Sequence, residues 1–344
     1  MRCINNPHWR WLTIALLVVT ATGCVSPAPS PLDATIPQTA RPIQADPQEF
    51  HFAMVGDRTA GHRVGVFEQA MAQLNLLRPE FVINVGDLIE GYSEDQATIN
   101  AQWDEIEEFT QRLGMKFFYV PGNHDISNDL QRREWNRRFG KDHYHFVYKN
   151  VLFVVLNTED PPPPKSNKRA LLSEYGGAAM GKVMQALQAN PDADFPDDPK
   201  LMELARKVRS ADAVNISPRQ VESVRQTLAR NKDVRWTVFL MHRPGWRYQS
   251  GEFRQIERMT ADRPYSMFAG HFHKYAYEQR NGRDYITLGT TGGSQPTGSV
   301  DHLMWVTMTS NGPEIANILQ SGLSDRKRLA VDVTKPEPVD MSRH

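Results

Sequence analysis

This chain of 344 residues has few cysteines, no net charge and no long apolar run. It contains two cysteines, and its 40 lysines and arginines equal its 40 aspartates and glutamates. So few cysteines exclude a disulfide scaffold, and the overall composition excludes a collagen or a coiled coil. Balanced charge without a Lys/Arg block leaves no electrostatic footprint for DNA or RNA. We therefore expect no nucleic acid as a bulk partner.

The apolar segment at residues 11–21 is too short for a hydrocarbon core, which needs about 20 residues to cross. Arg2 and Arg10 precede it without an acidic residue nearby, as in a secretory signal. The segment ends in Ala-Thr-Gly-Cys24, which resembles the lipobox of bacterial lipoproteins, where the cysteine is lipidated and starts the mature chain. An ordinary signal peptide cleaved near Ala21, or an uncleaved anchor, is the alternative.

The lipobox resemblance implies an exported protein that is anchored by lipid in the cell envelope. Val25 after the cysteine favours the outer membrane, with the protein facing the periplasm. The segment after Cys24 is rich in Pro, Ala, Ser, Thr and Gln and nearly lacks aromatics, so it cannot form a core and is expected to act as a tether. The expected organisation is a signal peptide at 1–23, a tether at 24–48, a globular unit at 49–320 and a flexible tail at 321–344. The sequence does not specify an oligomeric state.

Strand and helix patterns alternate within residues 49–320, which predicts an α/β sheet with covered faces. The predicted strands lie at 50–55, 81–85, 115–120, 143–148, 151–156 and 234–241, and the predicted helices at 64–77, 94–113, 130–139 and 217–230. Asn281-Gly282 lies between two stretches at 275–280 and 283–288 and predicts a hairpin. An insertion at about 160–215 contains two short helical stretches, 180–189 and 200–208, and is not expected to be a separate domain.

Short polar segments follow these strands or lie in the loop before the hairpin. They are Gly56-Asp57-Arg58-Thr59, Gly86-Asp87-Leu88, Gly122-Asn123-His124-Asp125, Met241-His242-Arg243 and Gly270-His271-Phe272-His273. Glycine lets the backbone turn sharply after a strand. Asp, Asn and His offer oxygen and nitrogen ligands without a thiolate, a set suited to Mn, Fe or Zn. The pattern predicts a site at the strand ends that can hold two metals.

Each segment alone has a plainer explanation, because Gly-Asp after a strand is commonly a turn or a helix cap. Together and in this order they resemble the calcineurin-like metallophosphoesterase superfamily. The pattern of that family runs Asp-x-His, Gly-Asp, Gly-Asn-His-Asp/Glu, a lone His and Gly-His-x-His. The resemblance spans residues 50–309. It implies a metallophosphoesterase-type four-layer α/β/β/α sandwich of two mixed sheets.

The resemblance also implies roles for individual residues. Asp87 would bridge two divalent or trivalent metal ions (Mn, Fe or Zn). Asp57 and His273 would complete one side of the centre, and Asn123, His242 and His271 the other. The metals would lower the pKa of a shared water, giving a hydroxide that attacks the phosphorus of a phosphoric ester. His124, oriented by Asp125, would protonate the leaving oxygen.

One segment departs from the family pattern, because Thr59 stands where the family has a histidine. Glu90, three residues after Asp87, occupies the position of a tyrosine ligand in purple acid phosphatases and is one candidate replacement. His62 is the other, although it could equally cap the following helix. The departure leaves two functions open. The protein is a phosphomonoesterase or phosphodiesterase, or it is a lipid-tethered binding or scaffold protein whose fold has lost turnover.

Three further features near the site have alternatives. Arg58 either binds the substrate phosphate with its forked donors or pairs with a nearby carboxylate. Residues 243–246 are expected to shape the pocket wall, with Trp246 either buried or exposed as a stacking surface. The segment 289–294, Gly-Thr-Thr-Gly-Gly-Ser, lacks the lysine and the following helix of a P-loop. A sharp turn near the site is therefore expected there.

Overall fold

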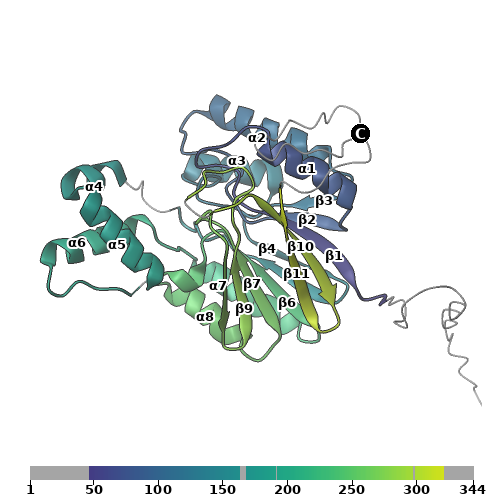
Figure 1. Ribbon diagram of the computed structural model, residues 1–344. Coiled ribbons are helices and arrows are strands. Elements are labelled where there is room, and N and C mark those ends of the chain that lie inside the picture. Colours follow the sequence, from purple (N-terminus) through teal and green to yellow (C-terminus); the bar gives the residue numbers. More distant parts are fainter. Residues whose placement is uncertain (1–45, 163–167, 191, 297–298, 321–344) are drawn as a thin grey trace, which may run out of the picture. The chain divides into compact units, whose positions relative to one another are not determined.

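A computed structural model describes residues 46–320 except 163–167, 191 and 297–298 (Figure 1). The predicted signal peptide, Cys24, nearly all of the tether and the tail lie outside the described residues. In the described part, one sheet has the strand order β11-β10-β1-β2-β3. Its strands are β1 (Phe50–Val55), β2 (Phe81–Asn84), β3 (Lys116–Phe118), β10 (His302–Thr309) and β11 (Gly312–Leu319). β1, β2 and β3 are parallel, whereas β10 runs antiparallel to both β1 and β11.

A second sheet has the strand order β4-β5-β6-β7-β9-β8. Its strands are β4 (Tyr144–Tyr148), β5 (Val151–Val155), β6 (Trp236–Leu240), β7 (Tyr265–Ala269), β8 (Ala276–Arg280) and β9 (Arg283–Thr287). β5, β6, β7 and β9 are parallel, and β4 and β8 pair antiparallel with their neighbours. Both sheets are therefore mixed, as predicted.

Helices cover the outer face of each sheet (Figure 1). The first sheet shares an apolar core with α1 (Val66–Leu77), α2 (Gln96–Gln111) and α3 (Asp129–Phe139). The second shares one with α7 (Pro218–Arg230), α8 (Gly251–Thr260) and the 3₁₀ turn η1 (Gly245–Arg247). Among the described residues, no helix has the length and apolar character needed to span a membrane. The order helix, sheet, sheet, helix confirms the predicted fold class.

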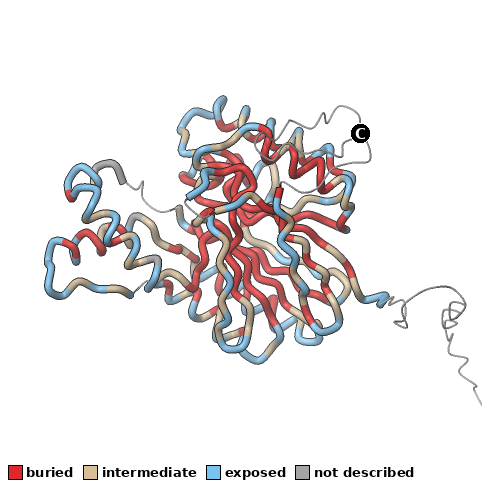
Figure 2. Tube along the Cα trace, viewed as in Figure 1, coloured by how far each residue is buried: buried red, intermediate tan, exposed pale blue. Residues whose placement is uncertain are grey.

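The two sheets bury their inner faces against each other, and these strands are the most buried part of the chain (Figure 2). Phe153 on β5 is fully buried at this interface. Its ring lies 5.3 Å from that of Phe52 on β1 and 5.4 Å from that of Phe81 on β2, edge to face in both cases. Such edge-to-face contacts add to the free energy gained by burying apolar surface. This shared core fixes one sheet against the other.

The insertion folds into α4 (Lys168–Tyr175), α5 (Gly177–Ala189) and α6 (Pro199–Ala211). The sequence predicted α5 and α6 but not α4. These helices share a core of their own around Val183 and Leu204. The chain leaves the sheet region and returns to it at one place, where Glu159 and Asn215 form a parallel bridge.

The predicted hairpin is present as β8 and β9. Asn281 and Gly282 have φ of 53° and 69°, as a two-residue type I′ turn requires. The sequence prediction missed β7, β10, β11 and α8, and it placed Gly270 in a loop rather than directly after a strand. β7 is buried along its whole length, so it lacks the polar/apolar alternation by which half-buried strands are recognised.

We expect Phe153→Ala to lower the free energy of unfolding by about 3 to 5 kcal/mol, because it opens a cavity between the sheets. Urea denaturation followed by circular dichroism measures the loss. The control is Val147→Ala on neighbouring β4, where the side chain is 47% exposed, with an expected loss below about 1 kcal/mol. Equal losses in the two variants would contradict a tightly packed interface.

Candidate metal centre

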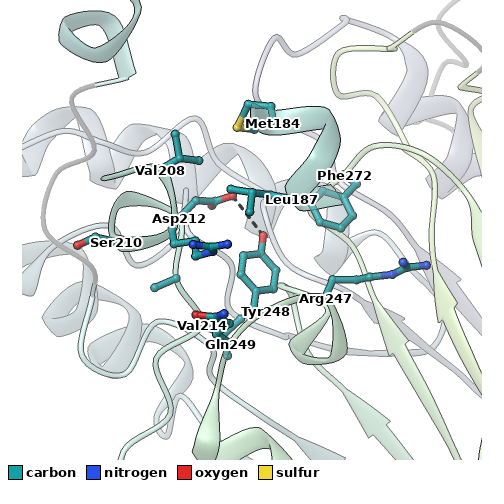
Figure 3. Close-up of a pocket in the computed structure, with 12 residues that line it drawn as sticks. Met184, Leu187, Val208, Ser210, Asp212, Val214, Arg247, Tyr248, Gln249 and Phe272 are labelled. Carbon is teal, nitrogen blue, oxygen red and sulfur yellow. Dashed lines mark hydrogen bonds between the residues drawn. The ribbon is translucent and has the colours of Figure 1, made fainter. Parts of the chain in front are cut away.

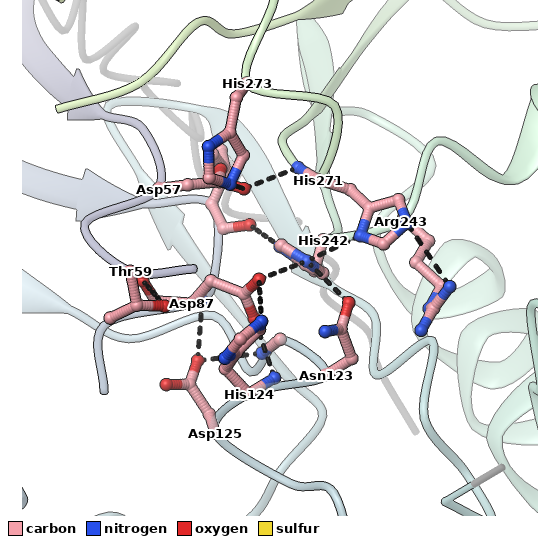
Figure 4. Close-up of polar contacts among 12 residues, drawn as sticks. Asp57, Thr59, Asp87, Asn123, His124, Asp125, His242, Arg243, His271 and His273 are labelled. Carbon is pink, nitrogen blue, oxygen red and sulfur yellow. Dashed lines mark hydrogen bonds and ion pairs between the residues drawn. The ribbon is translucent and has the colours of Figure 1, made fainter. Parts of the chain in front are cut away.

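The polar segments meet where the parallel strands of both sheets end. Asp57 and Asp87 follow β1 and β2, Asn123 lies in the loop after β3, and His242 and His271 follow β6 and β7. Loops at the carboxyl ends of neighbouring strands gather at one edge of a sheet. The structure thereby brings together the ligands implied by the resemblance, which are Asp57, Asp87, Asn123, His242, His271 and His273 (Figure 4).

One group of side chains converges on Nε2 of His242, which is fully buried. This nitrogen lies 3.1 Å from Oδ2 of Asp87, 3.1 Å from Oδ1 of Asn123 and 3.2 Å from Nδ1 of His271. The candidate ligand atoms of Asp87, His242 and His271 all lie within 4.8 Å of one another. Nitrogen and oxygen atoms so arranged can share one cation.

Asp57 and His273 form the second group. Oδ2 of Asp57 lies 3.2 Å from Nε2 of His273 and accepts a hydrogen bond of 2.9 Å from the backbone N–H of His271. The other oxygen, Oδ1, is buried and has no hydrogen-bond partner among the described residues. Leaving a buried carboxylate oxygen unpaired is costly, so this atom suits a cation.

Backbone carbonyl groups orient two of the imidazoles. Nδ1 of His242 donates to the carbonyl oxygen of Val85 at 2.9 Å, and Nδ1 of His273 donates to that of Ser294 at 2.6 Å. A carbonyl oxygen can only accept, so Nδ1 of each ring carries a proton. Nε2 of each ring faces a carboxylate, where a metal can take the place of its proton, the usual arrangement for histidines that bind metals.

Burial and charge oppose each other in this cluster. Burial lowers the pKa of His242, but the carboxylates of Asp87, Asp57 and Glu159 together outweigh it and raise the pKa to about 10. Burial raises the pKa of Asp87, and His242 and His124 together more than reverse this, so that the pKa lies well below its usual range. The Asp87 carboxylate therefore stays charged and attracts a positive partner.

Comparison with known proteins agrees with this geometry. The model of the calcineurin-like phosphoesterase family matches residues 46–275. The chain belongs to this family. No curated protein matches it.

Solved structures with a similar fold include a dimetal phosphatase from Danio rerio. It is 14% identical with a TM-score of 0.53, over 79% of this chain and 99% of that one. GAP50, the anchor in the inner membrane complex of Plasmodium, is 12% identical with a TM-score of 0.49, over 86% and 92% of the two chains. A purple acid phosphatase from yellow lupin is 12% identical with a TM-score of 0.48, over 78% and 53%.

Asp125 does not orient His124, contrary to the prediction. Its buried carboxylate accepts hydrogen bonds from backbone N–H groups of the loop after β2 and of its own turn. The donors are Asp87 (2.8 Å), Leu88 (2.9 Å), Ile89 (3.2 Å) and Gly122 (2.9 Å). Burial and the charge of Asp87 raise the pKa of Asp125 to about 6. With both oxygens occupied, Asp125 holds Asp87 in its left-handed conformation, φ 59°.

The carbonyl oxygen of Glu90 orients His124 instead. It accepts a hydrogen bond of 2.7 Å from Nδ1, and Nε2 lies 4.0 Å from Oδ2 of Asp87. The ring of Tyr92 packs edge to face on the imidazole with centroids 4.8 Å apart. Nε2 of His124 thus faces the ligand cluster.

The side chain of Glu90 is held by the loop after β1, so the structure does not support it as a ligand. Its carboxylate is exposed and accepts hydrogen bonds from the backbone N–H groups of Gly61 (3.3 Å) and His62 (3.0 Å). His62 is likewise not among the residues whose ligand atoms gather around Asp87. Thr59 donates its hydroxyl to the carbonyl oxygen of Asp87 at 3.2 Å. The Nε2 atom of His62 is buried and has no hydrogen-bond partner among the described residues, so His62 stays a candidate to replace the histidine of the family pattern.

Of the two roles that the sequence left open for Arg58, the structure shows the pairing with a carboxylate. The buried guanidinium donates to Oε1 of Glu105 at 2.7 Å and to the carbonyl oxygen of Leu88 at 3.2 Å. It also lies over the rings of Phe67 and Phe109. These contacts anchor the loop after β1 to α2, whereas the buried Nε of Arg58 has no hydrogen-bond partner among the described residues.

The predicted turn at 289–294 is confirmed, and it holds the backbone of Asp57. The carbonyl oxygen of Asp57 accepts hydrogen bonds from Thr290 Oγ1 (2.8 Å), Thr291 N (2.9 Å) and Gly293 N (3.1 Å). Trp246 is 5% exposed and packs against Tyr285. It is therefore a core residue and not a stacking surface.

Glycine is required at two positions beside the carboxylates. A Cβ at Gly122 would lie 2.2 Å from Oδ1 of Asp87, and one at Gly270 would lie 2.3 Å from Oδ1 of Asp57. Both distances are far shorter than a van der Waals contact. The glycines of these motifs therefore leave space for the ligands.

Sequence reasoning missed Tyr92 and Asp212 and gave Arg243 only a place in the pocket wall. The Tyr92 hydroxyl accepts a hydrogen bond of 3.1 Å from Nδ2 of Asn123. The buried Arg243 donates from Nε to Glu159 at 2.7 Å and from Nη1 to Asp212, and Nη1 lies 3.3 Å from Nε2 of His271. An arginine directly after a ligand was a signal in the sequence, whereas nothing local marked Asp212.

We expect Asp125→Asn to lower the free energy of unfolding by about 3 kcal/mol and to reduce metal content. Asparagine keeps one acceptor oxygen and turns an NH2 group toward two buried N–H donors. Denaturation and metal analysis measure the two effects. The control is Asp95→Asn, at the exposed N-cap of α2, where asparagine caps as well as aspartate. Similar losses in both variants would show that the Asp125 network is unimportant.

His302 leads to a pH prediction. Its buried Nε2 accepts a hydrogen bond of 2.8 Å from the N–H of Gly289, so the ring must be neutral, and burial lowers its pKa to about 4. The folded pKa lies below the unfolded value, so this stabilisation is complete above about pH 6.5 and is lost as the pH falls toward 4. We expect a loss of up to about 3 kcal/mol over that window. Denaturation at several pH values measures how the free energy of unfolding changes with pH. This free energy should fall less steeply toward low pH in His302→Phe than in the half-exposed control His51→Phe.

Proposed function

We propose that this phosphoesterase hydrolyses phosphoric esters at a centre of two metal ions, with Asp87 as the bridging ligand. Membership in the calcineurin-like phosphoesterase family supports metal-dependent phosphoester hydrolysis. The observation that carries the proposal is the convergence of the two ligand groups, in which Nε2 of His242 and of His273 faces a carboxylate. We assign Asp57 and His273 to one metal and Asn123, His242 and His271 to the other.

The donor atoms fit Mn, Fe or Zn, because they are carboxylate and amide oxygens with imidazole nitrogens. When bound, such metals neutralise charge on the phosphate and supply a nucleophile by lowering the pKa of a water. The unpaired Oδ1 of Asp57 and the left-handed Asp87 are the features of the chain that this role explains.

His124 is the proposed general acid. Because Nδ1 is committed to the carbonyl oxygen of Glu90, a proton to be transferred leaves from Nε2, which faces the cluster. Burial and the charge of Asp87 raise the pKa of Tyr92 to about 12, so this hydroxyl stays protonated at neutral pH. Since the Tyr92 oxygen accepts from Asn123, its own proton can be donated to an oxygen of the substrate.

We further propose that the protein is exported and tethered to the cell envelope through a lipid on Cys24. The lipobox-like segment and the tether that follows it support this proposal. Attachment at a membrane would place the phosphoesterase near substrates at the periplasmic face of the outer membrane.

Asp87→Asn tests the proposed function in a soluble form that starts after Cys24. The protein is stripped, reloaded with Mn, Fe or Zn, and assayed on aryl phosphate mono- and diesters. Changing residues around metal ligands typically costs about 10- to 100-fold in activity, so loss of the bridging ligand should cost at least about 100-fold. The control is Asp262→Asn, an exposed aspartate after α8, which should keep full activity.

A folded wild-type protein that binds metal but cleaves no ester would contradict the proposal. That result would favour the binding or scaffold protein as the function of this fold. Activity that persists in Asp87→Asn would contradict the assignment of the bridging ligand alone.

A further inference from the structure

A pocket of about 270 Å³ lies between the helical insertion and the loops that follow β6 and β7 (Figure 3). α5 and α6 form one side, and the segment around η1 together with Phe272 forms the other. The apolar side chains that line it are Met184, Leu187, Val208, Val214, Tyr248 and Phe272. The insertion therefore builds half of an apolar pocket that the two sheets alone would not have.

The pocket adjoins the metal centre through two residues. Asp212, at the end of α6, lines the pocket, and its Oδ1 lies 3.3 Å from Nε2 of His271. The same carboxylate pairs with the guanidinium of Arg243. Phe272 stands in the chain between His271 and His273. An ester whose phosphate lies at the metal centre can thus extend its organic group into this pocket.

Most of the polar side chains that line the pocket are paired within the protein. Arg247 pairs with Glu278 (3.1 Å), Gln249 donates to Asp192 (2.6 Å), Tyr248 donates to Asp212 (3.3 Å), and Arg209 donates to the carbonyl oxygen of Ala193. A sugar or a nucleobase placed here would exchange water for an apolar wall, which is unfavourable for its polar groups. An apolar group gains free energy in the same position.

We propose that the pocket binds the organic group of the substrate and selects phosphoric esters of bulky apolar alcohols. An apolar cavity of roughly 150 Å³ holds one benzene molecule. The present volume therefore has room for an aromatic or aliphatic group of about ten carbon atoms. The inference rests on the proposed function, because the phosphate is taken to lie at the metal centre.

Binding of phosphonates tests the proposal separately from turnover, because their carbon–phosphorus bond is not hydrolysed. Methylphosphonate, octylphosphonate and (1-naphthylmethyl)phosphonate are titrated by calorimetry into the metal-loaded full chain. We expect the two larger compounds to bind about 10- to 100-fold more tightly than methylphosphonate. The compound that binds more tightly, octylphosphonate or (1-naphthylmethyl)phosphonate, shows whether the pocket fits an aliphatic, lipid-like group or an aromatic group.

Leu187→Asp should abolish the tighter binding of the two larger phosphonates and leave methylphosphonate binding unchanged. The matched control is Leu172→Asp on α4 of the same insertion, where the leucine is 49% exposed and the preference should persist. Because Leu187 also touches the core of the insertion, Ala213→Trp provides a second variant. It fills the pocket without adding charge and should have the same effect.

Equal binding of all three phosphonates by the wild-type protein would overturn the inference, even if esters are hydrolysed. A preference that survives in folded Ala213→Trp would also overturn it. A preference that is lost in that variant, in a protein without turnover, would support the pocket and contradict the proposed function.

Discussion

The burial of two carboxylates, Asp57 and Asp87, is the constraint on which the site depends. Both are almost inaccessible to solvent, and a buried charge is tolerated only when it is paired and hydrogen-bonded. Imidazoles approach from the second sheet, backbone N–H groups approach from neighbouring loops, and Oδ1 of Asp57 remains for a cation. The cost of burying these charges explains why so many separate segments converge here.

Each sheet supplies what the other lacks. The first sheet places Asp57, Asp87 and Asn123 at the ends of its parallel strands, and the second places the histidines opposite them. The aromatic core between the sheets keeps these two sets in register, and the turn at 289–294 ties the second sheet back to Asp57. Packing far from the site thereby determines distances within it.

The helical insertion bears on which organic group of a substrate is selected. In the proposed function, metals held at the strand ends would contact only the phosphate group and would therefore accept any ester. α5 and α6 contribute an apolar wall, and Asp212 links that wall to His271 and Arg243. Selection of the organic group can therefore change through the insertion while the chemistry at the strand ends remains the same.

Local patterns in the sequence were enough to predict the α/β alternation, the hairpin at Asn281-Gly282 and the set of residues that gather at the strand ends. These features depend on neighbouring residues, because glycine turns and strand periodicity are short-range properties. The sequence did not reveal β7, whose complete burial removes the alternating pattern. It left two roles open for Arg58 and assigned Asp125 to His124.

The tertiary structure decided those roles because they depend on partners distant in the chain. Glu105 on α2 draws Arg58 away from the site, and the N–H groups of the loop after β2 occupy Asp125. Asp212 reaches His271 only because the insertion folds back beside the second sheet. The sequence by itself determined which chemical groups are present at the strand ends, whereas long-range packing determined which partner each group meets.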